Sequence, residues 1–293
     1  MGTEIARAVI DGVLTGGVYA LMAAGLTLIF GVMDIINIAQ GVLVVLGSYL
    51  SYVLYQDAGL DLFVGLLISI PALFVVGCAI EWLFIRRLAG KNRTGLSILV
   101  TYAVAIVIEG ILTAIFSSDY KRLNAWYVNR SIHVFGFYLP YIYVFGFALA
   151  VVLLALLYLI LYRTRLGQSI RASVQNRLGA ELIGININRV STLTFGIGTA
   201  VTAAGGMIFG ATTTFNPNTG YDLISRLLVI IVLGGLGSVG GALIAAVAML
   251  VIEDVTAVVW SPVWASTMFF AVLVVVLIVR PNGMFGHAAT RAQ

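Results

Sequence analysis

Long apolar segments separated by short polar stretches dominate this chain of 293 residues. A helix needs about 20 apolar residues to cross a hydrocarbon core roughly 30 Å thick. The pattern predicts an all-α, polytopic transmembrane bundle with nine spans, at residues 12–31, 41–56, 62–84, 96–117, 140–162, 190–213, 222–236, 241–259 and 264–280. Because the segment 222–236 is short, eight spans with a re-entrant or merged pair is the alternative.

Composition points the same way. Hydrophobic residues make up 61% of the chain and charged residues 10%, whereas a soluble domain carries about 25% charge. The two histidines, His133 and His287, have no zinc-site spacing, and the single cysteine, Cys78, has no plausible partner base. The residues therefore predict no catalytic site, no metal site and no bound cofactor.

Basic residues cluster after three of the spans, and this clustering predicts the orientation of the chain. Eleven of the 16 follow the third, fifth and last spans, namely Arg86, Arg87, Lys91, Arg93, Arg163, Arg165, Arg171, Arg177, Arg189, Arg280 and Arg291. Short loops rich in Lys and Arg stay on the cytoplasmic side. We therefore expect a multi-pass membrane protein with its amino terminus outside and its carboxyl terminus in the cytoplasm.

The longest basic loop, residues 163–189, has an amphipathic pattern. Apolar residues recur every four positions, and polar residues take the other side of the same predicted helix. The apolar set is Ile170, Val174, Leu178 and Leu182, and the polar set is Arg171, Gln175, Asn176 and Arg177. Gly179 and Gly184 predict breaks between short helices. On spacing alone, the loop is a helix lying on lipid headgroups.

Polar residues interrupt the apolar pattern after the first span. Asp34, Asn37 and Gln40 are spaced by three, so a continuing helix would place them close to one face. A charge at mid-membrane costs about 2.5–3.5 kcal/mol, so Asp34 should face protein, a wet cavity or an interface; a turn or helix cap is the alternative. The two amides suit a path for a polar, neutral or zwitterionic solute.

Four more acids lie inside predicted spans: Glu81, Glu109, Glu253 and Asp254. Glu81 is placed to pair with Arg86. Glu109 lies deeper, and we expect a structural acid bonded between helices, with a proton-relay site as the alternative. The last two are placed to meet Arg226 or to form an external rim.

Two spans share a small-residue pattern, which predicts an internal repeat. Residues 23–25 and 29–31 of the first span match residues 203–205 and 208–210 of the sixth with a one-residue difference in spacing. The two spans run in opposite directions, as in inverted-repeat transporters. We expect one domain, 1–293, with a first repeat at about 12–117 and a second at about 190–280; chance similarity of small-residue helices is the alternative.

Four stretches in order along the chain carry a family resemblance: 25–41, 166–184, 232–242 and 280–286. Together they resemble the permease subunits of branched-chain amino acid ABC transporters of the LivH type. Members commonly have Asn-Phe-Ala-His-Gly where this chain has Asn37-Ile38-Ala39-Gln40-Gly41. The departure leaves the solute open, and related importers take amides, urea or small organic acids.

The resemblance implies a subunit of a bacterial plasma (inner) membrane without catalysis of its own. Its implied partners are a sister permease, two cytoplasmic ATPases that use the ATP, and an external solute-binding protein. The loop 163–189 would then couple to the ATPases through its apolar residues and through polar contacts from Arg171, Gln175, Asn176, Arg177 and Glu181. The rivals are an ion-coupled carrier acting alone, with Asp34 or Glu109 as its proton site, and a non-transporting assembly partner.

Overall fold

The structure is a computed structural model that describes residues 1–88, 93–134, 137–280 and 283–284. Its helices are α1 (Gly2–Met33), α2 (Gln40–Gln56), α3 (Leu62–Leu83), η1 (Ile85–Arg87), α4 (Arg93–Phe116), α5 (Tyr141–Arg163), α6 (Arg165–Gln175), α7 (Arg177–Leu182), α8 (Ile187–Thr212), η2 (Pro217–Thr219), α9 (Gly220–Gly234), α10 (Val239–Val259) and α11 (Pro262–Val279). Two short strands, β1 (Ser131–Val134) and β2 (Phe137–Pro140), pair antiparallel. The all-α bundle is confirmed, while Lys91, His287, Arg291 and much of the 280–286 stretch lie outside the described residues.

Seven helices of the described part are long and apolar enough to cross a membrane: α1, α3, α4, α5, α8, α10 and α11. The other two predicted spans are also helical, but α2 has 17 residues and α9 has 15. Both are shorter than the roughly 20 residues of a full crossing. The expectation that the segment near 222–236 is short is confirmed, and α2 shares that property.

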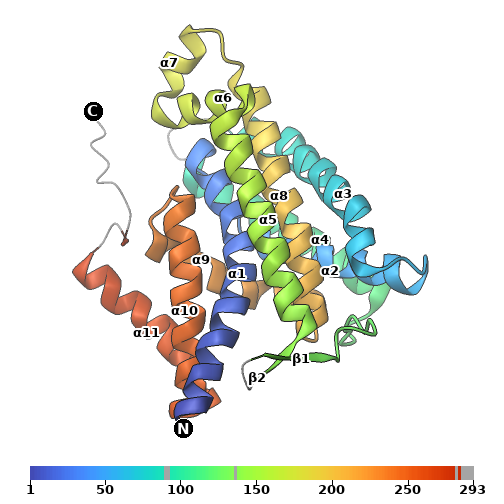
Figure 1. The fold of residues 1–293 in the computed structure, drawn as a ribbon. Helices are drawn as coiled ribbons and strands as arrows, with labels where there is room; N and C mark the ends of the chain where they lie inside the picture. Colours follow the sequence, from blue (N-terminus) through green and yellow to red (C-terminus); the bar gives the residue numbers. More distant parts are fainter. Residues whose placement is uncertain (89–92, 135–136, 281–282, 285–293) are drawn as a thin grey trace.

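The helices α1 and α8 are the most buried of the spans and form the centre of the bundle (Figure 1). α1 packs along α10 through glycines, since a Cβ at Gly12 or Gly16 would lie 2.6 or 2.7 Å from the Cα of Val251 or Val247. α8 packs along α3, where a Cβ at Gly196 would lie 2.6 Å from the sulfur of Cys78. α1 with α10 and α8 with α3 are thus two neighbouring pairs, and the inverted repeat stays a prediction.

The first turns of the short helices α2 and α9 pack against each other. A Cβ at Gly41, in the first turn of α2, would overlap the carbonyl oxygen of Gly220 and lie 2.9 Å from the backbone nitrogen of Ile224 in α9. A Cβ at Gly220 would lie 2.9 Å from the Cα of Val42. Only glycine permits this approach, so the start of α2 is fixed to the start of α9.

The ends of the bundle differ. The amino terminus and the β1–β2 hairpin lie at one end, and α6 and α7 project from the other (Figure 1). At the first end, Lys121 exchanges backbone hydrogen bonds of 2.9 Å with Phe215. Phe215 is fully buried and meets the ring of Tyr49 edge-on. The loop that follows α4 is thereby fixed to the loop that follows α8.

Candidate functional site

The α6–α7 hairpin is two helices rather than one. Asn176 leaves the helical region (φ −154°, ψ 102°), and its side chain accepts a hydrogen bond of 2.9 Å from the backbone nitrogen of Gly179. The prediction of one continuous apolar stripe is therefore wrong. Gly179 lies inside α7, whereas Gly184, at φ 88°, follows α7 as the predicted break.

The break at Asn176 also separates the four apolar residues. Ile170 is 2% exposed and packs into the bundle, whereas Val174, Leu178 and Leu182 are 50%, 73% and 84% exposed. Ile183, which the spacing did not single out, is 75% exposed. The hairpin thus has one buried anchor and an apolar tip, which we define as Val174, Leu178, Leu182 and Ile183.

Local hydrogen bonds and packing explain how α6 turns away from α5. The side chain of Thr164 caps α6 by accepting a hydrogen bond of 3.1 Å from the backbone nitrogen of Gly167. Gly167 lies against the carbonyl groups of the last turn of α5, where a Cβ would not fit. The guanidinium of Arg171 lies 4.7 Å from the ring centre of Tyr162. The remaining predicted polar residues, Gln175, Asn176, Arg177 and Glu181, are exposed.

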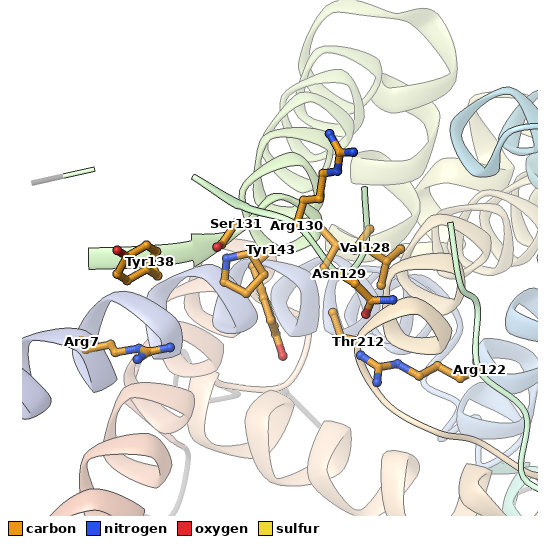
Figure 2. Close-up of a pocket in the computed structure, with 11 residues that line it drawn as sticks. Arg7, Arg122, Val128, Asn129, Arg130, Ser131, Tyr138, Tyr143 and Thr212 are labelled. Atoms are coloured by element: carbon orange, nitrogen blue, oxygen red, sulfur yellow. The ribbon is translucent and has the colours of Figure 1, made fainter. Parts of the chain in front are cut away.

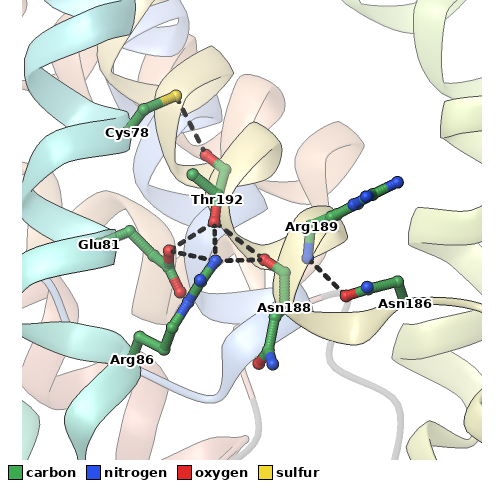
Figure 3. A network of polar contacts seen from close by, with 7 residues as sticks. All are labelled: Cys78, Glu81, Arg86, Asn186, Asn188, Arg189 and Thr192. Atoms are coloured by element: carbon green, nitrogen blue, oxygen red, sulfur yellow. Dashed lines mark hydrogen bonds and ion pairs between the residues drawn. The ribbon is translucent and has the colours of Figure 1, made fainter.

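A polar network fastens the start of α8, directly after the hairpin, to the end of α3 (Figure 3). Glu81 is 1% exposed and lies 3.6 Å from Arg86, so the predicted pair is confirmed. The hydroxyl of Thr192 donates a hydrogen bond of 2.6 Å to Glu81, and Arg86 donates one of 2.8 Å to Thr192. Because the buried carboxylate of Glu81 would lose a hydrogen bond if Thr192 moved away, α3 and α8 should move together.

The break after α1 separates the three polar residues predicted there. Asp34 caps α1 in the left-handed conformation (φ 59°), its backbone nitrogen donating to the carbonyl of Phe30, and it is exposed. Asn37 and Gln40 are fully buried. The chain leaves the helix at Asp34, which Asp tolerates better than most residues, so a single helical stripe of all three is wrong.

Asn37 and Gln40 nevertheless form a pair. The side-chain nitrogen of Asn37 donates a hydrogen bond of 3.0 Å to the side-chain oxygen of Gln40. Within the described part of the chain, the other amide atom of each residue has no hydrogen-bond partner. An unsatisfied buried polar group costs about 1–3 kcal/mol, so the pair is suited to a polar ligand. It lies directly before Gly41, where α2 meets α9.

Two predicted acids bridge neighbouring helices. The hydroxyl of Tyr221 in α9 donates a hydrogen bond of 2.5 Å to Glu109 in α4, in line with the expected structural role of Glu109. Arg226 in α9 lies 2.6 Å from a carboxylate oxygen of Glu253 in α10, so that predicted pair is confirmed. A further contact of 3.4 Å joins Arg226 to Ser266 in α11. The start of α9 is thus fixed by polar contacts on three sides.

A pocket of about 340 Å³ opens at the end of the bundle opposite the hairpin (Figure 2). Arg7, Arg122 and Arg130 line it from α1 and from the loop after α4. Arg7 lies 3.6 Å from Asp11, and the guanidinium of Arg130 lies 5.2 Å from the ring centre of Trp126, so three arginines line the pocket with one carboxylate nearby. Arginine binds carboxylate and phosphate through paired hydrogen bonds, so the pocket is suited to anionic groups.

Known proteins place the chain in a family. The family model described as the permease component of the branched-chain amino acid transport system matches residues 8–277. This chain belongs to that permease family. It is 29% identical to the high-affinity branched-chain amino acid transport permease protein BraD of Pseudomonas aeruginosa, covering 95% of this chain and 94% of BraD. It is 30% identical to LivH of Escherichia coli (strain K12), covering 94% of each.

The family extends to an archaeal relative. The probable LivH of Methanocaldococcus jannaschii is 25% identical to this chain, covering 96% of this chain and 92% of that protein. The resemblance predicted from the four sequence stretches is therefore confirmed. The permease is a multi-pass membrane component of an ABC transport system, not an enzyme.

Proposed function

We propose that this permease forms one half of the membrane domain of an ABC importer for branched-chain amino acids. A sister permease forms the other half, two cytoplasmic ATPases drive the cycle, and an external binding protein delivers the solute. The substrate class is that named for BraD and LivH, whose length the chain matches almost completely. ATP is used by the partner subunits.

The apolar tip of the hairpin carries this proposal. Monomeric proteins rarely leave large apolar side chains together in water unless a partner covers them. Leu178 and Leu182 of the six-residue helix α7, and Ile183 directly after it, are each more than 70% exposed, with Arg177 and Glu181 beside them. An apolar centre with a polar rim is the composition of a protein interface. The occupant we propose is a cleft on the ATPase.

The hairpin lies on the cytoplasmic side in this proposal. Arg163, Arg165, Arg177 and Arg189 surround it, and the positive-inside rule places such a loop in the cytoplasm. The amino terminus and the β1–β2 hairpin, whose Ser131 and Tyr138 line the arginine-lined pocket, lie at the opposite end and then face outward (Figure 1). Acidic side chains of an external binding protein have the charge and geometry to enter that pocket.

The contacts supply a route for movement from the hairpin to the pathway. Nucleotide-driven closure of the ATPases pushes α6 and α7, and the network around Glu81 and Thr192 passes the displacement to α3 and α8 together. α8 packs on both α1 and α2. Asn37 and Gln40 lie between these helices and change their exposure to the pathway, while Asp34 lies at its cytoplasmic mouth.

The proposal is tested by shortening the apolar tip. Burying a leucine side chain stabilises an interface by about 2 kcal/mol, so the double variant Leu178→Ala, Leu182→Ala should weaken ATPase association about 30-fold per residue. Leu67→Ala in α3, where the leucine is 77% exposed, is the matched control. The measurements are ATPase co-purification and leucine uptake in proteoliposomes. Unchanged association in the double variant would refute the assignment.

The solute is tested in the same proteoliposomes. Excess leucine, isoleucine or valine should compete with labelled leucine uptake, whereas urea, amides and small organic acids should not. Competition by one of the latter classes alone would reassign the substrate and leave the ATPase coupling intact.

A further inference from the structure

Charged and hydroxyl side chains gather on one outward face of the bundle, formed by α4, α9 and α11. We define this polar face as Glu109, Tyr221, Asp222, Ser225, Arg226, Glu253 and Ser266. Asp222, Ser225 and Ser266 are exposed, and Glu109, Tyr221 and Arg226 are half-buried. Glu253 contributes through its ion pair with Arg226 from the adjoining α10.

The polar face lies at membrane depth. α4 is one of the helices long and apolar enough to cross the membrane, and Glu109 lies seven residues before its end at Phe116. At 1.5 Å per residue this is about 10 Å inside the end of the helix. Ionisable groups within membrane spans face a bundle interior or a water-filled cavity, not lipid. The polar face therefore faces water or protein in the assembled transporter.

The exposed surface of α5 differs from the polar face in its side chains. In α5, every exposed residue from 145 to 159 is apolar or a tyrosine, including Val151, Val152 and Leu156. Such a surface is compatible with hydrocarbon. The exposed surface of α5 thus carries no charged side chain over this length, whereas the polar face carries Glu109, Asp222 and Arg226.

The signs of the charges indicate what the path attracts. Three carboxylates, on Glu109, Asp222 and Glu253, accompany one guanidinium, on Arg226. The guanidinium is held by Glu253, with both carboxylate oxygens within 2.7 Å of one nitrogen. Glu109 and Asp222 remain beyond this pair, and Asp222 lies one helical turn before Arg226. The face therefore favours positively charged groups.

We infer that the polar face lines a water-filled solute path, closed on its far side by the second permease, and that Glu109 and Asp222 meet the ammonium group of a zwitterionic solute. Arg226, oriented by Glu253, offers its second nitrogen, beside Ser266, to the carboxylate. The buried pair Asn37 and Gln40 lies behind the start of α9, next along the path. This inference rests on the proposed importer function and adds the residues that recognise its solute.

The single native cysteine makes a direct test possible. In a Cys78→Ser background whose uptake is checked first, Ser225→Cys and Ser266→Cys place a thiol on the polar face. Val152→Cys places one on the apolar side and is the matched control. The assembled transporter in proteoliposomes is treated with membrane-impermeant cationic and anionic methanethiosulfonate reagents, with and without ATP.

We expect the thiol at position 225 or 266 to react at least tenfold faster than the control. At position 225 the cationic reagent should react faster than the anionic one, whereas position 266, which contacts the Arg226 guanidinium, should show no such cation preference. Glu109→Gln should reduce the cation preference at position 225, and leucine with its binding protein should slow the reaction. Rates equal to those of Val152→Cys in both nucleotide states would overturn the inference. A charge preference that is absent, or unchanged by Glu109→Gln, would refute the ammonium contact.

ATPase co-purification on the same samples separates this inference from the function on which it rests. Fast labelling without ATPase recruitment would refute the importer function and still support an aqueous path. Normal ATPase recruitment with an unreactive thiol at position 225 would refute the aqueous path and leave the importer function intact.

Discussion

The contact between the starts of α2 and α9 yields a sharp prediction. Gly41→Ala adds a methyl group that overlaps the carbonyl oxygen of Gly220 and lies 2.9 Å from the backbone nitrogen of Ile224. Both neighbours are backbone atoms, so no side-chain rotation relieves the overlap. We expect α2 and α9 to be forced apart, with loss of stability and of transport.

The magnitude follows from two opposing effects. Overpacking a close contact costs typically about 1–3 kcal/mol, while alanine in place of glycine inside a helix gains about 0.5–1 kcal/mol. The net expectation for Gly41→Ala is a loss of about 1–2 kcal/mol. Gly110→Ala in α4 is the matched control, because no atom lies within 4 Å of its added Cβ. Only the helix gain applies there, so the control should be slightly stabilised.

The assay is thermal unfolding of both variants in the same detergent, followed by leucine uptake and ATPase co-purification. Gly41→Ala should unfold several degrees below Gly110→Ala, since 1 kcal/mol corresponds to roughly 2–4 °C for a protein of this size. Its ATPase recruitment should be normal, because α6 and α7 lie at the end of the bundle and make no contact with Gly41. Equal unfolding temperatures would refute the packing argument.

Three further changes test other contacts. Arg226→Gln leaves the carboxylate of Glu253 buried without its partner and should cost about 3–5 kcal/mol, whereas the double change Arg226→Met, Glu253→Leu should restore most of that loss in a detergent melting curve. Gly184→Ala places a side chain at φ 88°, at about 1–2 kcal/mol, and should make the loop 163–189 more sensitive to limited proteolysis. Tyr127→Phe removes a hydrogen bond of 3.0 Å to Asp61 and should cost about 1 kcal/mol. Burial raises the pKa of the Tyr127 hydroxyl. The hydrogen bond therefore contributes fully to stability below the ordinary tyrosine pKa of about 10, and the contribution is lost only as the pH rises through the raised pKa. The difference in stability between the variant and the parent protein should be constant from about pH 6 to 9.

The helices were predictable because each membrane span is a long run of apolar residues in the sequence. Each of the nine apolar segments is a helix, since hydrocarbon requires every backbone group to be satisfied within the segment. Pairings between acids and bases were predictable where charge inside a span left few partners. Arg226 with Glu253, and Glu81 with Arg86, are of this kind.

Breaks between helices and sites on the surface were harder to predict from the sequence. A spacing of four residues does not distinguish one helix from two, so the break at Asn176 was missed, although asparagine before a helix is a recognised cap. The spacing of three that groups Asp34 with Asn37 fails because the chain turns left-handed at Asp34. The arginine-lined pocket joins Arg7 to Arg130 across 123 positions of sequence, and no local pattern records such a meeting.

Each short helix of the hairpin begins at its own side-chain cap, Thr164 for α6 and Asn176 for α7, and α8 begins at Asn186. The starts of these helices are therefore set by caps within the 27 residues of the loop, while Gly167 and Ile170 hold α6 against the bundle. Leu178 and Leu182 can then change during evolution to fit a different ATPase without accompanying changes in the membrane-spanning helices. A graft of this loop between relatives should carry partner choice with it.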